Sequence, residues 1–191
     1  MPVDYLTQQQ YSEYGKFVEP PTTDELARCF HLDDHDLGII QSKRGAHNKL
    51  GFALQLSTLR YLGTFIPQPF DVPDSVIHTL MLQLHIDHEV VDASLYLKGS
   101  QRWDHMQQIR ALYGYTDLSE MRIAFYFSRW LYTLCWSGTD RPSALFDKSQ
   151  YWLIAHKVIL PGRSTLERFI ARLRSRVLQP FKNVKAKVSC R

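Results

Sequence analysis

Hydrophobic residues recur at helical spacing near the carboxyl end of the chain, and this stretch is the clearest element that the pattern predicts. At about 100° per residue the apolar positions lie within one face of a helix. These positions are Leu166, Phe169, Ile170, Leu173 and Val177. Pro161 and Gly162 interrupt the preceding element, and Ser164 with Glu167 has the spacing of a capping box. We therefore predict a helix that begins at Ser164 and packs this apolar face inward.

The opposite face of the same helix carries guanidinium groups separated by small side chains. Its members are Ser164, Thr165, Arg168, Ala171, Arg172 and Ser175. Arginine pairs bidentately with guanine or with phosphate, so this face suits the major groove of DNA. An apolar helical run over 151–160 and a short turn precede it, which is the outline of a helix-turn-helix reader. Solvated arginine-rich faces and ordinary helical hairpins share the pattern, and they remain the alternative.

The rest of the pattern is helical as well, and it predicts an all-α fold. Short helices are expected from Thr7, from Thr22 to Glu25, and from either Asp33 or Asp34. A longer helix, capped by Asn48, is apolar almost all the way round and is expected to be buried. Further helices are expected over 74–84, 89–97, 101–113 and 117–136, and from Arg141 onward. The apolar segment 117–136 is expected to be the buried centre of its subdomain.

We expect two tandem small helical subdomains of helix-turn-helix type. The Lys98-Gly99-Ser100 step is the best boundary between them. The expected organisation is a first subdomain with an amino-terminal arm over residues 1–98, a second over 99–180, and a basic tail over 181–191. Pro180 is expected to separate the tail, which includes Lys182, from the helix before it.

A second basic group lies where the long apolar helix begins. Its residues are Lys43, Arg44, His47, Asn48 and Lys49. Unpaired N–H groups at a helix start attract phosphate, so this short turn followed by a helix is a candidate phosphate contact. A merely solvated loop fits the composition equally well.

Charge is distributed unevenly along the 191 residues. Residues 1–140 carry 11 Lys and Arg against 17 Asp and Glu, a net charge of −6, whereas residues 141–191 carry 12 against 2, a net charge of +10. A basic segment on an acidic chain indicates a polyanionic partner, either nucleic acid or an anionic membrane surface. The most apolar run, 121–136, contains two arginines and is too short to span a bilayer, and the chain does not open with a signal peptide. We expect a cytoplasmic protein.

Cysteine and histidine usage gives little support to a metal site. Cys29, Cys135 and Cys190 are odd in number and lack Cys-x-x-Cys spacing, which indicates reduced thiols. No metal or cofactor is expected. Two histidine groups are the metal-binding alternatives, His31 with Asp33, His35 and Asp36, and the pair His85 and His88.

An enzyme has the least support among the classes of function. The chain shows no glycine-rich phosphate loop, no nucleophile elbow and no carboxylate set with an acid or base partner. A module that docks on another protein through its apolar helices and acidic first half is the remaining alternative to DNA binding.

Several runs of the chain resemble one family of bacterial proteins. The longest are Phe30 to Leu37, Arg44 to Leu56 and Leu59 to Phe65; shorter ones are Leu6 to Tyr11, Arg102 to His105 and Tyr113 to Tyr115. They are similar to the amino-terminal region of the Tn-three family of replicative transposases. The resemblance covers most of the chain, and its long middle block is specific.

This resemblance implies a function and a set of partners. In the family, this region binds the terminal inverted repeats of the element through two helical DNA-binding subdomains, and the catalytic Asp/Asp/Glu domain lies much further along. We therefore expect sequence-specific binding to double-stranded DNA, without catalysis in this segment and with the remaining transposase domains as possible partners. Base-reading candidates are Ser164, Thr165, Arg168 and Arg172; phosphate-contact candidates are Arg163, Arg174, Arg176 and Lys182; candidates of the first subdomain are Lys43, Arg44, His47, Asn48 and Lys49.

Overall fold

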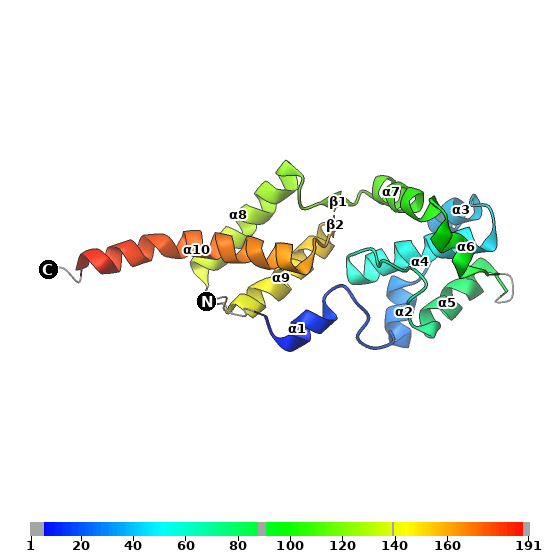
Figure 1. The fold of residues 1–191 in the computed structure, drawn as a ribbon, viewed down its shortest axis with the longest axis horizontal. Helices are drawn as coiled ribbons and strands as arrows, with labels where there is room; N and C mark the ends of the chain where they lie inside the picture. Colours follow the sequence, from blue (N-terminus) through cyan, green and yellow to red (C-terminus); the bar gives the residue numbers. More distant parts are fainter. Residues whose placement is uncertain (1–5, 88–90, 139, 189–191) are drawn as a thin grey trace. The chain divides into compact units, whose positions relative to one another are not determined.

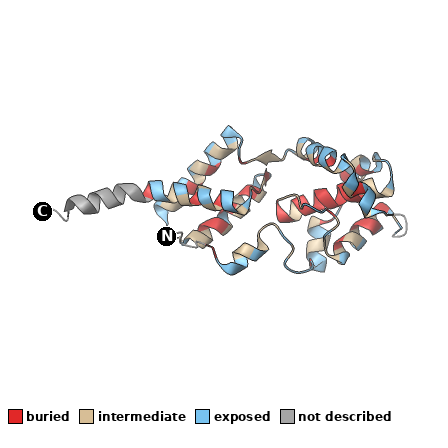
Figure 2. Cartoon of the chain, viewed as in Figure 1, coloured by how far each residue is buried: buried red, intermediate tan, exposed pale blue. Residues whose placement is uncertain are grey.

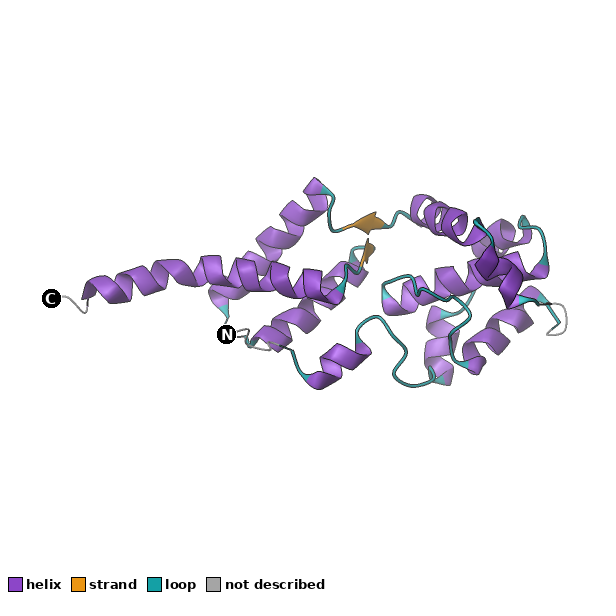
Figure 3. Ribbon diagram, in the orientation of Figure 1, coloured by secondary structure: helices purple, strands orange, loops and turns teal. Residues whose placement is uncertain are grey.

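The computed structural model describes residues 6–87, 91–138 and 140–188, and the side chains of its last helix as far as residue 177. The described chain is all-α, with ten helices and a single pair of two-residue strands (Figure 1, Figure 3). No helix among the described residues is both long enough and apolar enough to cross a membrane.

The chain forms two compact units. Unit 1 comprises residues 1–14 together with 116–191, and unit 2 comprises residues 15–115. The expected boundary at Lys98-Gly99-Ser100 lies inside unit 2, between two helices that both pack on the same central helix. The expected amino-terminal arm is divided, and its first part belongs to unit 1. A Gly-Ser step marks a turn, whereas the division into units depends on which helices share a core.

Unit 2 is built around one helix, α4 (Ala46–Leu62), against which five others pack. The others are α2 (Thr23–Cys29), α3 (Asp34–Gln41), α5 (Asp74–Leu84), α6 (Ala93–Lys98) and α7 (Gln101–Tyr113). Residues 50–59 of α4 are all buried, which confirms the prediction from its all-round apolar pattern (Figure 2).

The helix starts of unit 2 follow local rules, with one correction. Thr22 and Asp33 each form a capping box, with Glu25 and Asp36 respectively, at two of the expected helix starts, and Asp33 rather than Asp34 is the N-cap of α3. Asn48 does not cap α4, because the N-cap is Gly45, whose φ of 83° suits glycine. The Asn48 side chain instead donates to the Arg44 carbonyl oxygen at 2.8 Å.

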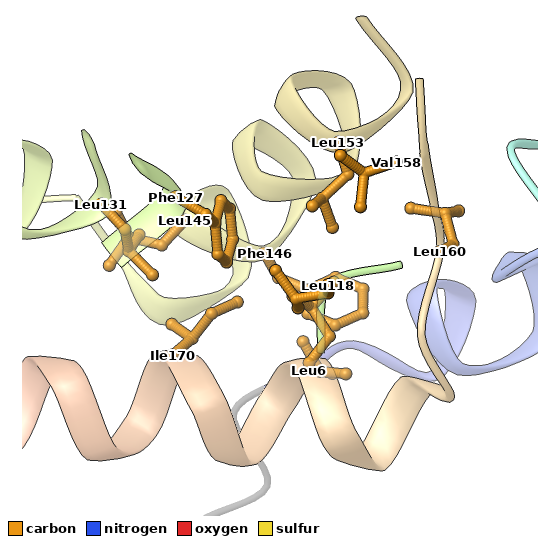
Figure 4. Close-up of a cluster of buried hydrophobic side chains, with 11 residues drawn as sticks. Leu6, Leu118, Phe127, Leu131, Leu145, Phe146, Leu153, Val158, Leu160 and Ile170 are labelled. Atoms are coloured by element: carbon orange, nitrogen blue, oxygen red, sulfur yellow. The ribbon is translucent and has the colours of Figure 1, made fainter. Parts of the chain in front are cut away.

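Unit 1 centres on three of its helices, with α10 packed on both α8 and α9. Its elements are α1 (Gln8–Glu13), β1 (Thr116–Asp117), α8 (Met121–Ser137), α9 (Pro142–Ala155), β2 (Val158–Ile159) and α10 (Arg163–Val188). Strands β1 and β2 pair in parallel, with Thr116 opposite Val158. The buried cluster between the helices draws on all three and on Leu6 of the amino-terminal segment (Figure 4).

Three expectations for unit 1 need correction. The helical run predicted over 151–160 ends at Ala155, because Lys157 takes a φ of 53° and the chain then pairs as β2. Helix α10 begins at Arg163, one residue before the predicted start, and the Gly162 carbonyl accepts the first helical hydrogen bonds, so Ser164 lies within the first turn. The tail expected after Pro180 is helical to Val188, and residues 189–191 lie outside the described residues.

Helix α8 also differs from the expectation that it is wholly buried. Phe127 and Leu131 are fully buried, but Met121, Phe125 and Trp136 are 88%, 61% and 56% exposed. The segment is therefore amphipathic, with one face in the core and an aromatic face in solvent.

Candidate nucleic-acid interface

Helix α10 presents its basic face outward because its apolar face is fixed in the core of unit 1. Leu166, Ile170 and Val177 are between 0% and 4% exposed, as the spacing predicted. Phe169 and Leu173 complete this face by packing against the same cluster. The outward positions Ser164, Thr165, Arg168, Arg172 and Arg176 are all exposed. The packing of one face thus determines the direction of the other.

The outward arginines are available for a partner. Among the described residues, none of Arg168, Arg172 and Arg176 is in an ion pair with a carboxylate. Arg168 donates from Nε to the carbonyl oxygen of Ser164 at 3.0 Å, which orients its side chain along the helix toward the first turn. The outward face therefore carries guanidinium charge without a compensating acid from the described part of the chain.

Two other arginines of α10 face the protein itself. Arg163 donates to the Tyr11 carbonyl oxygen at 2.9 Å, and its guanidinium lies 4.2 Å from the centre of the Tyr11 ring. Arg174 is half-buried beside α8, where its charge opposes the rise that burial causes in the pKa of Cys135. Both were expected at phosphates, and the structure places them away from the exposed row. The side chain of Lys182 lies outside the described residues.

The amino-terminal segment fixes the start of α10. The Tyr14 hydroxyl donates to the Pro161 carbonyl oxygen at 2.6 Å, just before the helix begins. Gln10 donates to the carbonyl oxygen of Ser143 at 3.1 Å and to the Asp147 carboxylate at 2.7 Å. The Tyr14 bond and the Arg163 contact to Tyr11 hold the first turn of α10 in place, and the Gln10 bonds join α1 to α9; the sequence alone did not reveal this role.

The five basic or polar residues expected to contact phosphate in the first subdomain lie together where α3 joins α4. Lys43 donates to Gln108 at 2.6 Å and lies 4.7 Å from the Phe52 ring, and Lys49 donates to Gln41 at 2.6 Å. His47 is half-buried, with its ring close to Gly45. Arg44 is the exposed cation of the group. Burial lowers the pKa of Lys43. Most of this group is therefore engaged within unit 2.

The carboxylates of the metal-binding alternative have other partners. Possible ligand atoms of Asp33, His35 and Asp36 lie within 4.8 Å of one another. The Asp36 carboxylate, however, accepts two hydrogen bonds from Arg60 and one from Tyr113, and Asp33 caps α3. The group is thus explained by the folding of α3. The other alternative pair includes His88, which lies outside the described residues.

Comparison with known proteins agrees with the resemblance described above. The family model described as "Domain of unknown function (DUF4158)" matches residues 5–173, nearly the whole of the described chain. The chain belongs to the DUF4158 family. The DUF4158 match includes both units and ends within α10, after the exposed Arg172.

Curated relatives of this DUF4158 chain are transposases. It is 40% identical over 179 residues, 94% of the chain, to the transposase for transposon gamma-delta of Escherichia coli (strain K12). It is 31% identical over 169 residues, 87% of the chain, to the transposase for transposon Tn1546 of Enterococcus faecium. It is 31% identical over 154 residues, 78% of the chain, to the transposase for transposon Tn501 of Pseudomonas aeruginosa.

The chain matches only a small part of each relative. The matches span 18%, 16% and 15% of these transposases, and the matched part is their amino-terminal region. The chain is thus similar to the amino-terminal region of these transposases, as the resemblance implied.

Proposed function

We propose that this chain is the DNA-binding amino-terminal region of a replicative transposase, and that it binds double-stranded DNA at the terminal inverted repeats of the element. The outward row of α10 reads the sequence, and the exchange of DNA strands belongs to other parts of the full protein. The observation that carries the proposal is the exposure of Arg168, Arg172 and Arg176 on a helix whose opposite face is buried.

Charge supports a polyanionic partner for unit 1. The net charge of +10 falls on residues 141–191, and the described part of this segment forms α9, the connection through β2, and α10. Exposed guanidinium groups on a rigid helix match the major groove, where arginine donates two hydrogen bonds to guanine. Small neighbours such as Ser164 and Thr165 let the helix approach base edges closely.

The connection between α9 and α10 differs from the turn of a simple helix-turn-helix. In a simple helix-turn-helix, a turn of three or four residues joins the two helices. Here residues 156–162 intervene, and two of them pair with β1. We propose that this pairing and the bond from Tyr14 to Pro161 fix the angle at which α10 meets DNA, in place of a tight turn.

The test is a mobility-shift titration of the full chain with two duplexes of equal length. One duplex carries the inverted repeat that ends the element, and the other carries the same bases in scrambled order. Tighter binding to the repeat, retained at rising salt, supports sequence reading. Equal binding to both duplexes would leave only electrostatic attraction and would overturn the proposal.

A pair of variants locates the reading surface. Loss of one bidentate base contact costs about 1–3 kcal/mol, so Arg172→Ala should weaken binding to the repeat by about 5- to 150-fold and bring it closer to binding of the scrambled duplex. Arg141→Ala removes an exposed cation of unit 1 at the start of α9 and serves as the control. Equal effects of the two variants on both duplexes would exclude α10 as the reader.

A protein-docking module is the second candidate, and one observation favours it. The apolar residues Met121, Phe125 and Trp136 of α8 are exposed along one line of that helix. Exposed apolar patches of this kind often mark protein interfaces. A chain that binds neither duplex even at low salt would favour docking over DNA binding.

A further inference from the structure

A groove of about 510 Å³ opens between α8 and the carboxyl end of α9 in unit 1. Its lining includes the aromatic side chains Tyr126, Trp130, Trp152 and His156, together with Arg129 and Thr133. We call it the aromatic groove. Its volume lies within the range of about 300–1,000 Å³ that small-molecule sites occupy.

The rings of the aromatic groove form a fixed stack. The His156 ring lies parallel to the Trp152 indole, with centroids 3.8 Å apart, and Trp152 stacks on Trp130 at 5.6 Å. Both indoles also contact the fully buried Phe127, at 5.2 and 5.8 Å. The His156 ring is held in addition by a hydrogen bond of 2.8 Å between its Nδ1 and the Trp152 carbonyl oxygen. A flat ligand would therefore meet rings that need little reorganisation.

The charge around the aromatic groove is positive. Arg129 lines it, no carboxylate does, and the Arg122 guanidinium lies 5.8 Å from the centre of the Tyr126 ring. At 100° per residue, Arg122 and Arg129 lie on α8 between the groove and the exposed line of Met121, Phe125 and Trp136. The sequence of α8 contains no Asp or Glu at all. The groove thus combines ring faces with a cationic edge.

We propose that the aromatic groove binds an unpaired nucleotide of single-stranded DNA, with the base stacked on the groove's rings and the adjoining phosphates at Arg122 and Arg129. Stacking on aromatic side chains together with basic groups is how proteins hold single strands without reading their sequence. Duplex DNA does not fit this role, because its base faces are covered by neighbouring bases. This inference rests on the proposal that the chain acts on DNA, but it concerns a surface other than the outward row of α10.

The test measures binding of the full chain to a short oligothymidylate by fluorescence anisotropy, with quenching of the tryptophan emission as a second readout. Tyr126 is 48% exposed, so Tyr126→Ala should fold normally, which a thermal melt checks. We expect Tyr126→Ala to weaken oligothymidylate binding by about tenfold and Tyr126→Phe to retain it, because the ring and not the hydroxyl stacks on the base. Arg129→Ala should lower the salt dependence of the same binding.

Tyr151→Ala is the matched control. Tyr151 is 76% exposed on α9 and does not line the groove, so its loss should leave oligothymidylate binding unchanged. The same variants are titrated with the inverted-repeat duplex, for which Tyr126→Ala should bind as tightly as the unchanged chain.

Two outcomes overturn the aromatic groove as a nucleotide site. One is oligothymidylate binding that is equal for Tyr126→Ala and the unchanged chain. The other is binding of an acidic, aromatic peptide in the groove under conditions where oligothymidylate does not bind, which would identify a protein-docking site. Neither outcome bears on the proposal that α10 reads duplex DNA, because that proposal is tested separately by titrating Arg172→Ala with the repeat duplex.

Discussion

The carboxylate of Asp36 is the most connected buried charge in the described part of unit 2, and its removal tests how that unit is held together. The residue is 0% exposed. It accepts hydrogen bonds from the Arg60 guanidinium at 2.7 and 2.9 Å and from the Tyr113 hydroxyl at 2.7 Å. These bonds join α3 to α4 and α7. Asp36→Ala therefore removes a link among three helices at once.

The expected cost follows from the charge that Asp36→Ala leaves behind. Breaking a buried ion pair by removing one partner costs about 3–5 kcal/mol, because the other charge stays desolvated. The Arg60 side chain is 27% exposed, so water compensates for part of this loss. We expect a destabilisation of about 2–4 kcal/mol, which for a unit of this size lowers the melting temperature by roughly 10–20 °C.

The measurement is urea denaturation followed by circular dichroism, with hydrogen exchange of the α3 and α4 amides to assign the loss to unit 2. Asp34→Ala is the matched control, because Asp34 is an exposed acid in the first turn of the same helix. It should cost no more than about 1 kcal/mol. If Asp36→Ala and Asp34→Ala were equally stable, the inference that this network stabilises unit 2 would be refuted.

The pH dependence gives an independent check on Asp36. Burial by itself would raise its pKa, but the hydrogen bonds from Arg60 and Tyr113 and the charge of Arg60 outweigh burial and hold the pKa below its ordinary value of 3.8. A group with a lowered folded pKa contributes stability that is present above that ordinary value and is lost as the pH falls further. The unchanged chain should therefore lose stability below about pH 4 more steeply than Asp36→Ala.

Two further predictions concern the packing of Tyr96. In Gly51→Ala, the added Cβ would lie 2.5 Å from the fully buried Tyr96 ring, so we expect the free energy of unfolding in urea to fall by about 1–3 kcal/mol. In Gly38→Ala, the added Cβ has nothing within 4 Å, so this variant should instead stabilise the protein by up to about 1 kcal/mol. His105, which lies 2.9 Å from the Tyr96 hydroxyl, has its pKa lowered to about 4 by burial and by the charge of Lys43. The stability that neutral His105 contributes is complete above pH 6.5, the ordinary pKa of histidine. This contribution should fall by up to about 3 kcal/mol as the pH drops to 4. His105→Gln should abolish this loss if the reasoning holds.

Much of the helical architecture could be predicted from local pattern. The inward face of α10 and the all-round burial of α4 followed from apolar spacing, because a helix repeats every 3.6 residues whatever surrounds it. The approximate starts of α1, α2 and α3 followed from polar residues near Thr7, Thr22 and Asp33, whose side chains bond to backbone only three residues away. The outward direction of Arg168 and Arg172 followed in turn from the face that α10 buries.

Predictions from the sequence pattern were wrong where the same local signal is compatible with more than one structure. Ser164 and Glu167 have capping-box spacing, yet α10 starts one residue earlier, after Gly162. The apolar composition of α8 suggested full burial, but its residues divide between a core face and an exposed aromatic face. An apolar run gives the amount of hydrophobic surface without saying which neighbours cover it.

What the sequence by itself determined is therefore the set of helices, the face that α10 buries, the burial of α4, and the concentration of positive charge in the last quarter of the chain. The tertiary structure decided which cations remain outward: Arg163 is tied to Tyr11, 152 residues away, while Arg172 stays exposed. It also decided that the amino-terminal segment shares a core with α8, α9 and α10, and that Asp36 meets Arg60 and Tyr113. Contacts between distant residues exist only once the helices have packed, so no local pattern can encode which partners they choose.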